Sequence, residues 1–481
     1  MKKIMSVGLV FCMCEFLGFA GEPNKQTDSA ELSALRQRVE ELENQNRKML
    51  QLVIEIQRRL DNASVGVGST MPSAASLQSS EKVALEPAAL HADSKPASPG
   101  MQADEAARNK QPVLWSELLD PESRIKFYGF LRVDFDLDSQ RPNAAQNPLF
   151  ILSPDPRGGA DAGNFSMHPR LTRFGVDYIG SKVSGLNDGK LSGKMELDFQ
   201  NGGSESRQII RIRHAYFKMN WRDFSILGGQ TWDTFSPLFP TPNDDTVMWW
   251  VGNVGDRRPQ FRAAYEPKTE QGQWSFRSSL GLTGAVDPQD LDQDGFRDGE
   301  VSRRPNVQAR VGYSQKLWAR SAASSFGLSG FYGWLETVKP VAGRTDFHIQ
   351  GLNFDYTLPF SDRVALAGEN WWGRNMGDFR GGAGQGIVSG HEVRGRGGWS
   401  ELKLGLSRYW SVNTGISIDD PVDGDLPNGG RVRNRAVYIA NRITPGAKFL
   451  IGFDYLRWKT NYKGLQPGID NRFNLFFQYG Y

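Results

Sequence analysis

Apolar and polar residues alternate along the C-terminal segment of this chain, and the apolar set is rich in aromatics. One face carries Phe473, Leu475, Phe477, Tyr479 and Tyr481. The opposite face carries Arg472, Asn474, Gln478 and Gly480. A period of two residues predicts a β-strand. Because so aromatic a face is unsuited to water, we expect it to touch lipid while the polar face meets water, as in transmembrane β-barrels.

The same alternation recurs from about residue 125 onward, between turns rich in Gly, Asp, Asn and Pro. It is clearest at 127–137, 190–199 and 306–314. Further strands are expected at 172–180, 208–219, 222–231, 259–266, 273–284, 326–336, 347–358, 363–373, 398–407, 410–418, 433–443, 447–458 and 470–481. About sixteen strands result, and a barrel of that size encloses an aqueous channel rather than a filled core.

A soluble β-sandwich would show the same alternation, with its apolar faces turned inward. Opposed charges on the polar faces and the large number of strands favour the barrel. The mean hydropathy of −0.49 does not argue against it, because only alternate residues of a barrel strand face lipid. The predicted fold is all-β: a 16-stranded antiparallel transmembrane β-barrel with an N-terminal α-helical coiled coil.

The first residues predict export. Lys2 and Lys3 precede an apolar stretch from Ile4 to Leu17, and Gly18-Phe19-Ala20 offers a cleavage site, so 1–20 is expected to be a signal peptide. Both cysteines would leave with it, which excludes disulfides and thiolate metal sites in the mature chain. The formal charge of +3 would fall to +2, which gives no general electrostatic case for nucleic-acid binding.

Residues 21–61 are predicted to form a periplasmic coiled coil, because apolar residues follow a heptad seam from Leu32 to Leu60. Asn46 at one seam position would fix the register. The spacing does not separate two strands from three, and a lone amphipathic helix is the alternative. Residues 62–122, rich in Ala, Ser and Pro, are expected to be a flexible linker, and 123–481 the barrel domain.

Arginines dominate the cations on the polar strand faces. Those expected inside the pore are Arg132, Arg173, Arg211, Arg213, Arg262, Arg277 and Arg310. Rings of such side chains favour anions, and a guanidinium matches the geometry of carboxylate and phosphate. The alternative is that they pair with Asp134, Asp136, Asp177, Glu196 and Asp198 as part of the wall.

Two loops carry further candidate residues. The segment 232–255, with Trp232, Asp233, Phe235, Asp244 and Asp245, is predicted to fold into the lumen and narrow it; a surface loop or subunit contact is the alternative.

The second loop is acidic. Asp290, Asp292, Asp294 and Asp298 stand at positions one, three, five and nine of a pattern like the early part of an EF-hand, with Gly295 at six. Val301 replaces the expected Glu at twelve, so an extracellular Ca²⁺ site and a merely solvated acidic loop both remain open. No cofactor is required, and the scattered histidines and missing catalytic motifs predict that the chain is not an enzyme.

Several short motifs carry a family resemblance. They are Phe127-Tyr128-Gly129-Phe130-Leu131-Arg132-Val133-Asp134, the run from His168 to Val176, Arg213-His214-Ala215-Tyr216, and Gly228-Gly229-Gln230-Thr231-Trp232. With the order of signal, coil, linker and barrel, they resemble the DcaP-like trimeric outer-membrane porins. The resemblance implies a homotrimer in the outer membrane that passes small anions, notably dicarboxylates. It also implies pore-side cations at Arg132, Arg170 and Arg173 and a constriction after Trp232.

The expected function is passive diffusion of small anionic solutes through an arginine-lined pore. Phosphate is an alternative solute. A different alternative is an envelope tether, in which the coil binds peptidoglycan or a periplasmic partner and the barrel is an anchor.

Overall fold

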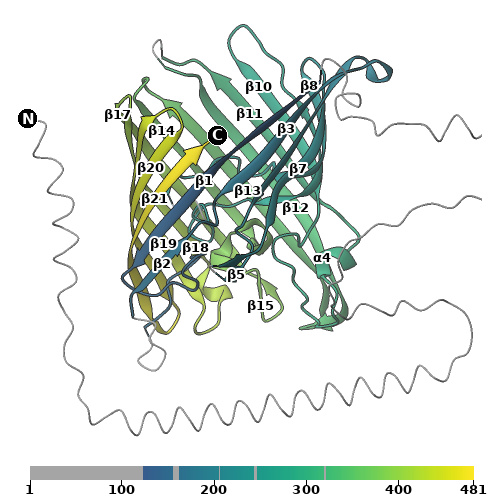
Figure 1. The fold of residues 1–481 in the computed structure, drawn as a ribbon. Coiled ribbons are helices and arrows are strands. Elements are labelled where there is room, and N and C mark those ends of the chain that lie inside the picture. Colours follow the sequence, from purple (N-terminus) through teal and green to yellow (C-terminus); the bar gives the residue numbers. More distant parts are fainter. Residues whose placement is uncertain (1–122, 155–161, 205, 243–245, 319–320) are drawn as a thin grey trace, which may run out of the picture. The chain divides into compact units, whose positions relative to one another are not determined.

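The computed structural model describes residues 123–154, 162–204, 206–242, 246–318 and 321–481. Within them one antiparallel sheet closes into a barrel (Figure 1). Its strands are β1 Arg124–Asp138, β2 Asn164–His168, β3 Arg173–Val183, β4 Gly189–Asp198, β7 Arg211–Asn220, β8 Phe224–Trp232, β9 Arg257–Tyr265, β10 Gln273–Gly281, β11 Asn306–Gln315, β12 Ser324–Val341, β13 Arg344–Pro359, β14 Val364–Arg374, β17 Arg394–Ser407, β18 Trp410–Pro421, β19 Arg431–Gly446, β20 Phe449–Tyr462 and β21 Leu465–Gly480.

The barrel closes where the first and last strands meet. On one side β1 pairs with β21, from Phe130 opposite Gly480 to Asp138 opposite Arg472. On its other side β1 pairs with both β2 and β3. These two therefore form a single barrel strand, interrupted after His168 by Pro169, which lacks a backbone donor. Counted this way the barrel has sixteen strands, and closure leaves no open edge.

All sixteen expected strands are present, and their boundaries differ by several residues. The largest difference is in the second strand, expected at 172–180, which also includes β2 before the interruption. On β21, Phe473 and Tyr479 are exposed whereas Arg472 and Asn474 are buried. On β1, Phe127 is 72% exposed and Asp134 is 1% exposed. A soluble sandwich would bury those aromatics, so the apolar faces point outward, as in a membrane barrel.

The two ends of the barrel differ. At the end where β1 begins, the strands are joined by turns of 2 to 8 residues, such as that between β17 and β18. The opposite end, hereafter the loop end, carries most of the long connections. The barrel also has several short helices and hairpins, most of them at the loop end. These are η2 Ser184–Leu186 at the short-turn end and, at the loop end, the hairpins β5 Gly203–Ser204 with β6 Arg207–Gln208 and β15 Ile387–Val388 with β16 His391–Glu392, α4 Asp298–Val301, η3 Gly377–Phe379, η4 Gly382–Gly384 and η5 Asp423–Asp425. In outer-membrane barrels the short turns are periplasmic and the long loops extracellular.

The predicted signal peptide, coiled coil and linker lie outside the described residues. Among the described residues, no helix is long and apolar enough to span a bilayer.

Candidate pore constriction

The long connection between β8 and β9 contacts inward side chains of the barrel wall. The backbone N–H of Thr234 donates to Gln308 Oε1 on β11 at 2.8 Å. Further along, Trp371 Nε1 of β14 donates to the carbonyl of Gly252 at 2.8 Å, and Asn434 Nδ2 of β19 donates to the carbonyl of Trp250 at 2.8 Å. The loop thus lies along the inner wall from β11 to β19.

Two inward carboxylates fasten this loop to the wall. Glu369 on β14 is fully buried and accepts hydrogen bonds from the Ser236 hydroxyl and, at 2.9 Å, from the Leu238 N–H. Glu401 on β17 accepts from Thr241 Oγ1 at 2.7 Å and from its N–H at 2.8 Å. Because a carboxylate accepts strongly from several donors at once, each glutamate replaces water that the loop backbone would otherwise need.

A second loop, between β14 and β17, locks the first in place. Arg258 is fully buried and donates to Asp233 Oδ1 at 2.6 Å and to Asp378 Oδ2 at 2.7 Å. Its guanidinium carbon lies 4.0 Å from the ring centroid of Phe379, which stacks at 3.6 Å on Phe331 of β12. Arg258 is not among the site residues predicted from the sequence.

A third inward contact comes from the β1–β2 connection. Ile151 is fully buried, and its N–H donates to Thr460 Oγ1 of β20 at 2.9 Å. The ring of Phe150 stacks on Trp250 with 6.2 Å between centroids, and Thr246 Oγ1 donates to the Pro148 carbonyl. These contacts, together with Met248 and Val251, form an apolar cluster between the loops and the wall.

The wall opposite the loop is basic. Glu196 and Asp198 of β4 lie among arginines of the neighbouring strands: Arg213 Nε is 2.6 Å from Glu196 and its Nη1 is 2.8 Å from Asp198. Arg211 Nη2 is 2.7 Å from Asp198, and Arg173 Nε is 3.5 Å from Glu196. Since β4 and β7 lie about half the barrel away from β14 and β17 in strand order, this group faces the loop across the lumen.

Arg257, which the sequence analysis also missed, connects this wall to the loop. Its guanidinium carbon lies 4.1 Å from the ring centroid of Trp232, and Arg211 and Arg213 act on it electrostatically. Asp256 is shared: it lies 3.6 Å from Arg257 Nη2 and 2.8 Å from Arg380 Nη2. Arg257 Nη1 has no hydrogen-bond partner among the residues that the structure describes. The adjacent arginines after the predicted loop were the available sequence signal.

Charges around the constriction do not balance. In the described residues, six guanidinium groups gather here with the three carboxylates Glu196, Asp198 and Asp256. The six belong to Arg173, Arg211, Arg213, Arg257, Arg262 and Arg380. Arg262 donates to the carbonyl of Trp232 and to Gln260 Oε1 at 2.8 Å rather than to a carboxylate. This set, hereafter the basic cluster, carries a net positive charge.

The other predicted pore cations, outside the basic cluster, are each bound by an oxygen atom of the protein. Arg132 Nη2 lies 2.6 Å from Asp134 Oδ1, and Arg310 Nη2 lies 2.6 Å from Asp355 Oδ1, both buried. Arg170 is buried and donates to the Gln146 carbonyl at 2.6 Å, and Arg277 lies 2.6 Å from Glu266. These contacts match the alternative in which arginines pair within the wall.

The predicted aromatic residues of the loop pack against other aromatic rings. Phe235 is fully buried, 4.7 Å from the Phe331 ring centroid, and Trp232 lies 4.2 Å from that of Phe239. Asp244 and Asp245 lie outside the described residues.

The acidic loop brings its carboxylates together. Oxygens of Asp290, Asp292 and Asp294 lie within 4.8 Å of one another. Asp298 is 1% exposed; its Oδ2 accepts from the N–H of Leu291 at 3.0 Å, and its Oδ1 has no partner in the described part of the chain. Burial and the nearby carboxylates raise the pKa of Asp298 to about 6. Glu300 pairs with Arg297 at 2.5 Å.

Taken together, a sixteen-stranded antiparallel barrel, an apolar exterior, a charged interior and a loop folded into the lumen define the porin class of outer-membrane protein. The barrel is similar to the outer membrane channel DcaP of Acinetobacter baumannii, with a TM-score of 0.59 and 17% sequence identity over 75% of this chain and 97% of that one. The expected resemblance is therefore confirmed at the level of the fold.

Two further solved structures match less well. OmpT of Vibrio cholerae in its trimer form has a TM-score of 0.46 and 12% identity, over 75% of this chain and 99% of that one. An anion-selective porin from Comamonas acidovorans has a TM-score of 0.46 and 11% identity, over 75% of this chain and all of that one (100%). No protein-family model matches the chain, and no curated protein matches it in sequence.

Proposed function

We propose that this protein is a passive outer-membrane channel for small anions of the dicarboxylate type. The observation that carries the proposal is the charge imbalance of the basic cluster at the constriction. A solute crossing between the loop and this wall passes guanidinium groups that are not matched by carboxylates. Such groups keep their charge near neutral pH and bind carboxylate oxygens in pairs.

Arg257 is central to the proposal. It lies against Trp232, Arg211 and Arg213 act on it electrostatically, and its buried Nη1 has no hydrogen-bond partner among the described residues. Arg132, Arg170 and Arg310 instead support the wall, because each is engaged by a protein oxygen. Phosphate presents similar acceptor oxygens and is the alternative solute.

Planar-bilayer recordings test the selectivity. In a salt gradient the wild-type channel is expected to give a reversal potential that favours anions, and Arg257→Gln or Arg213→Gln should shift it towards zero. Arg222→Gln is the matched control, because its side chain is 93% exposed at a short turn. Equal anion and cation permeability in the wild-type protein would refute the proposal, and currents blocked by succinate or by phosphate would separate the two solutes.

We further propose that the protein assembles as a homotrimer, with the heptad segment within 21–61 as a periplasmic coiled coil. The support is the heptad pattern, since no contact of that segment is described. Deleting 21–61 should weaken trimers in detergent if the coil drives assembly. If trimers persist but peptidoglycan co-sedimentation is lost, the tether alternative gains support.

A Ca²⁺ site on the acidic loop is also proposed. Asp290, Asp292, Asp294 and Asp298 would hold the ion, because hard oxygen donors suit Ca²⁺ and the buried Asp298 Oδ1 has no hydrogen-bond partner in the described part of the chain. Bound there, the cation would offset repulsion among four carboxylates.

A further inference from the structure

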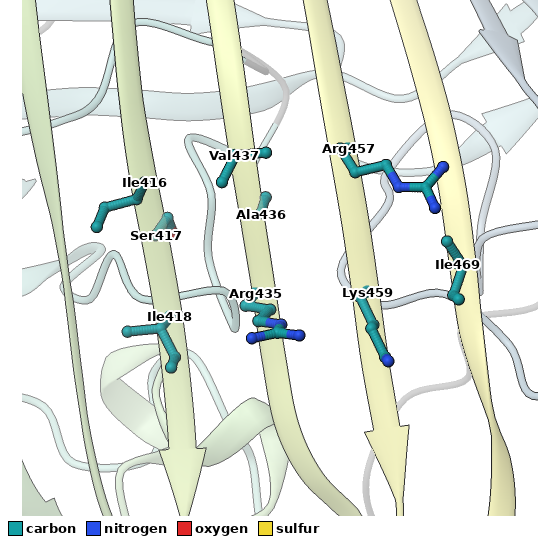
Figure 2. A pocket seen from close by; sticks show the side chains of 9 residues that line it. All are labelled: Ile416, Ser417, Ile418, Arg435, Ala436, Val437, Arg457, Lys459 and Ile469. Atoms are coloured by element: carbon teal, nitrogen blue, oxygen red, sulfur yellow. The ribbon is translucent and has the colours of Figure 1, made fainter.

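Cationic side chains gather on the outer surface of the barrel near its loop end. Three strands present these side chains outward: Arg396 on β17, Arg433 and Arg435 on β19, and Arg457 and Lys459 on β20. Figure 2 shows three of these cations, Arg435, Arg457 and Lys459, beside isoleucines of β18 and β21. Most of the barrel exterior is apolar, so this patch needs its own explanation.

The register aligns the patch in rows across the strands. Ile418 lies opposite Arg435, Arg435 opposite Lys459, and Lys459 opposite Ile469. One rung further from the loop end, Ile416 lies opposite Val437 and Val437 opposite Arg457. Cations and aliphatic side chains therefore share one surface.

The charges of the patch are poorly compensated. Asp420 is shared by Arg433, at 2.7 Å, and Arg396, at 3.3 Å. Arg457 donates to the amide oxygen of Asn471 at 2.8 Å. Neither Arg435 nor Lys459 forms an ion pair with any described residue. Of the five cations, only Arg396 and Arg433 have a carboxylate partner among the described residues, and it is the same one.

The patch lies at the loop end of the barrel. Arg433 and Arg435 are close to the start of β19, which follows the loop containing η5. Lys459 is close to the end of β20. Cations near the hydrocarbon midplane of a barrel are costly, whereas near the interface they are tolerated, so this position suits lipid headgroups.

Below the cations an apolar groove continues towards the middle of the barrel. One hollow of about 500 Å³ is lined by Ile416, Ile418, Val437 and Ile469 together with the cations. A second of about 490 Å³ shares Ile416 and Val437 and adds Leu402, Ile439 and Tyr455. The groove is therefore amphipathic: the cations lie near the loop end of the barrel, and the aliphatic side chains lie closer to its middle.

We propose that this groove binds a phosphate-bearing lipid of the outer leaflet, with its phosphates on Arg435 and Lys459 and an acyl chain along Ile416 and Val437. Arginine and lysine clusters recognise phosphate headgroups by paired hydrogen bonds and by charge. A twofold contact with the same face of a second copy is less suited, because it would bring like charges together. The inference rests on the proposed outer-membrane orientation, with the loop end outward.

Native mass spectrometry of the full-length protein in detergent, titrated with bis-phosphorylated lipid A, tests the proposal. The wild-type protein is expected to retain the lipid, and the Arg435→Gln/Lys459→Gln variant to bind it roughly tenfold more weakly. Arg408→Gln/Lys448→Gln is the matched control, because both cations are exposed at the short-turn end. Dephosphorylated lipid A should bind the wild-type protein weakly.

Equal affinity of the two variants, or equal retention of the dephosphorylated lipid, would overturn the proposal. So would a change in the number of copies per complex without a change in lipid retention, which would mark the face as a subunit interface. Arg433→Gln/Arg457→Gln tests the same site from the neighbouring positions. Reversal potentials of these variants should equal that of the wild type, so a failure here is distinguishable from a failure of the pore proposal.

Discussion

Arg258 and Asp233 form a buried ion pair, with 2.6 Å between Arg258 Nε and Asp233 Oδ1. Arg258 lies at the start of β9, and Asp233 is the first residue of the loop between β8 and β9. The same guanidinium reaches Asp378 on the second inward loop, 120 residues away in sequence. One side chain therefore joins the two loops that shape the constriction.

Replacing Arg258 by Ala should release both loops. Removing one member of a buried ion pair costs about 3–5 kcal/mol, because the carboxylates are left buried and unpaired. We expect larger and noisier single-channel currents and a lower unfolding temperature. Arg222→Ala, at an exposed position, should change neither. Unaltered conductance in Arg258→Ala would show that the loops hold their position without this pair.

Glu369→Ala should loosen the loop at a second point. The substitution removes the acceptor for the Ser236 hydroxyl and the Leu238 N–H, and leaving a buried donor unsatisfied costs about 1–3 kcal/mol. We expect higher conductance and faster protease cleavage within 236–242. Glu266→Ala, whose carboxylate pairs with Arg277 away from the loop, is the control. Matching cleavage rates in the two variants would contradict the anchoring role.

The strands could be predicted from sequence because successive residues of each strand face lipid and the barrel interior in turn. Phe473 and Tyr479 meet the exterior while Arg472 and Asn474 meet the interior, and that alternation is visible without any long-range information. The inward loop was predictable for a related reason, since a long segment with aromatics and prolines breaks the pattern.

Pairs of residues that come together only when the barrel closes could not be predicted from the sequence. Asp378 meets Arg258 only because two loops enter the same lumen from different strands, and nothing local indicates the pair. Likewise the predicted arginines look equivalent in sequence, but Arg310 is neutralised by Asp355 on β13 while Arg257 shares its carboxylate with Arg380. The interruption of the second barrel strand at Pro169 was not predicted either, because it becomes visible only when β1 is seen to pair with both β2 and β3.

The lipid-facing exterior can be tested at two depths. Leu352 is 58% exposed near the middle of β13, and Leu352→Arg should destabilise the barrel by about 2–4 kcal/mol, because a cation there meets hydrocarbon. Val338, 65% exposed near the loop end of β12, should tolerate Arg at a cost of about 0–1 kcal/mol. Urea unfolding in lipid vesicles measures both. Equal costs at the two positions would contradict a bilayer around the barrel.

Calcium should stabilise the acidic loop. A ligand that binds the folded state at a hundred times its Kd adds about 2.7 kcal/mol, so thermal unfolding in detergent should shift upward with Ca²⁺ and return with chelator. Asp292→Asn/Asp298→Asn should abolish the shift, because it removes two of the four proposed donors. Asp346→Asn, an exposed carboxylate on β13 outside the cluster, should retain it. If chelator leaves the wild-type transition unchanged, the acidic loop binds no Ca²⁺. If Mg²⁺ reproduces the shift fully, the loop is a general divalent-cation site and not a calcium site.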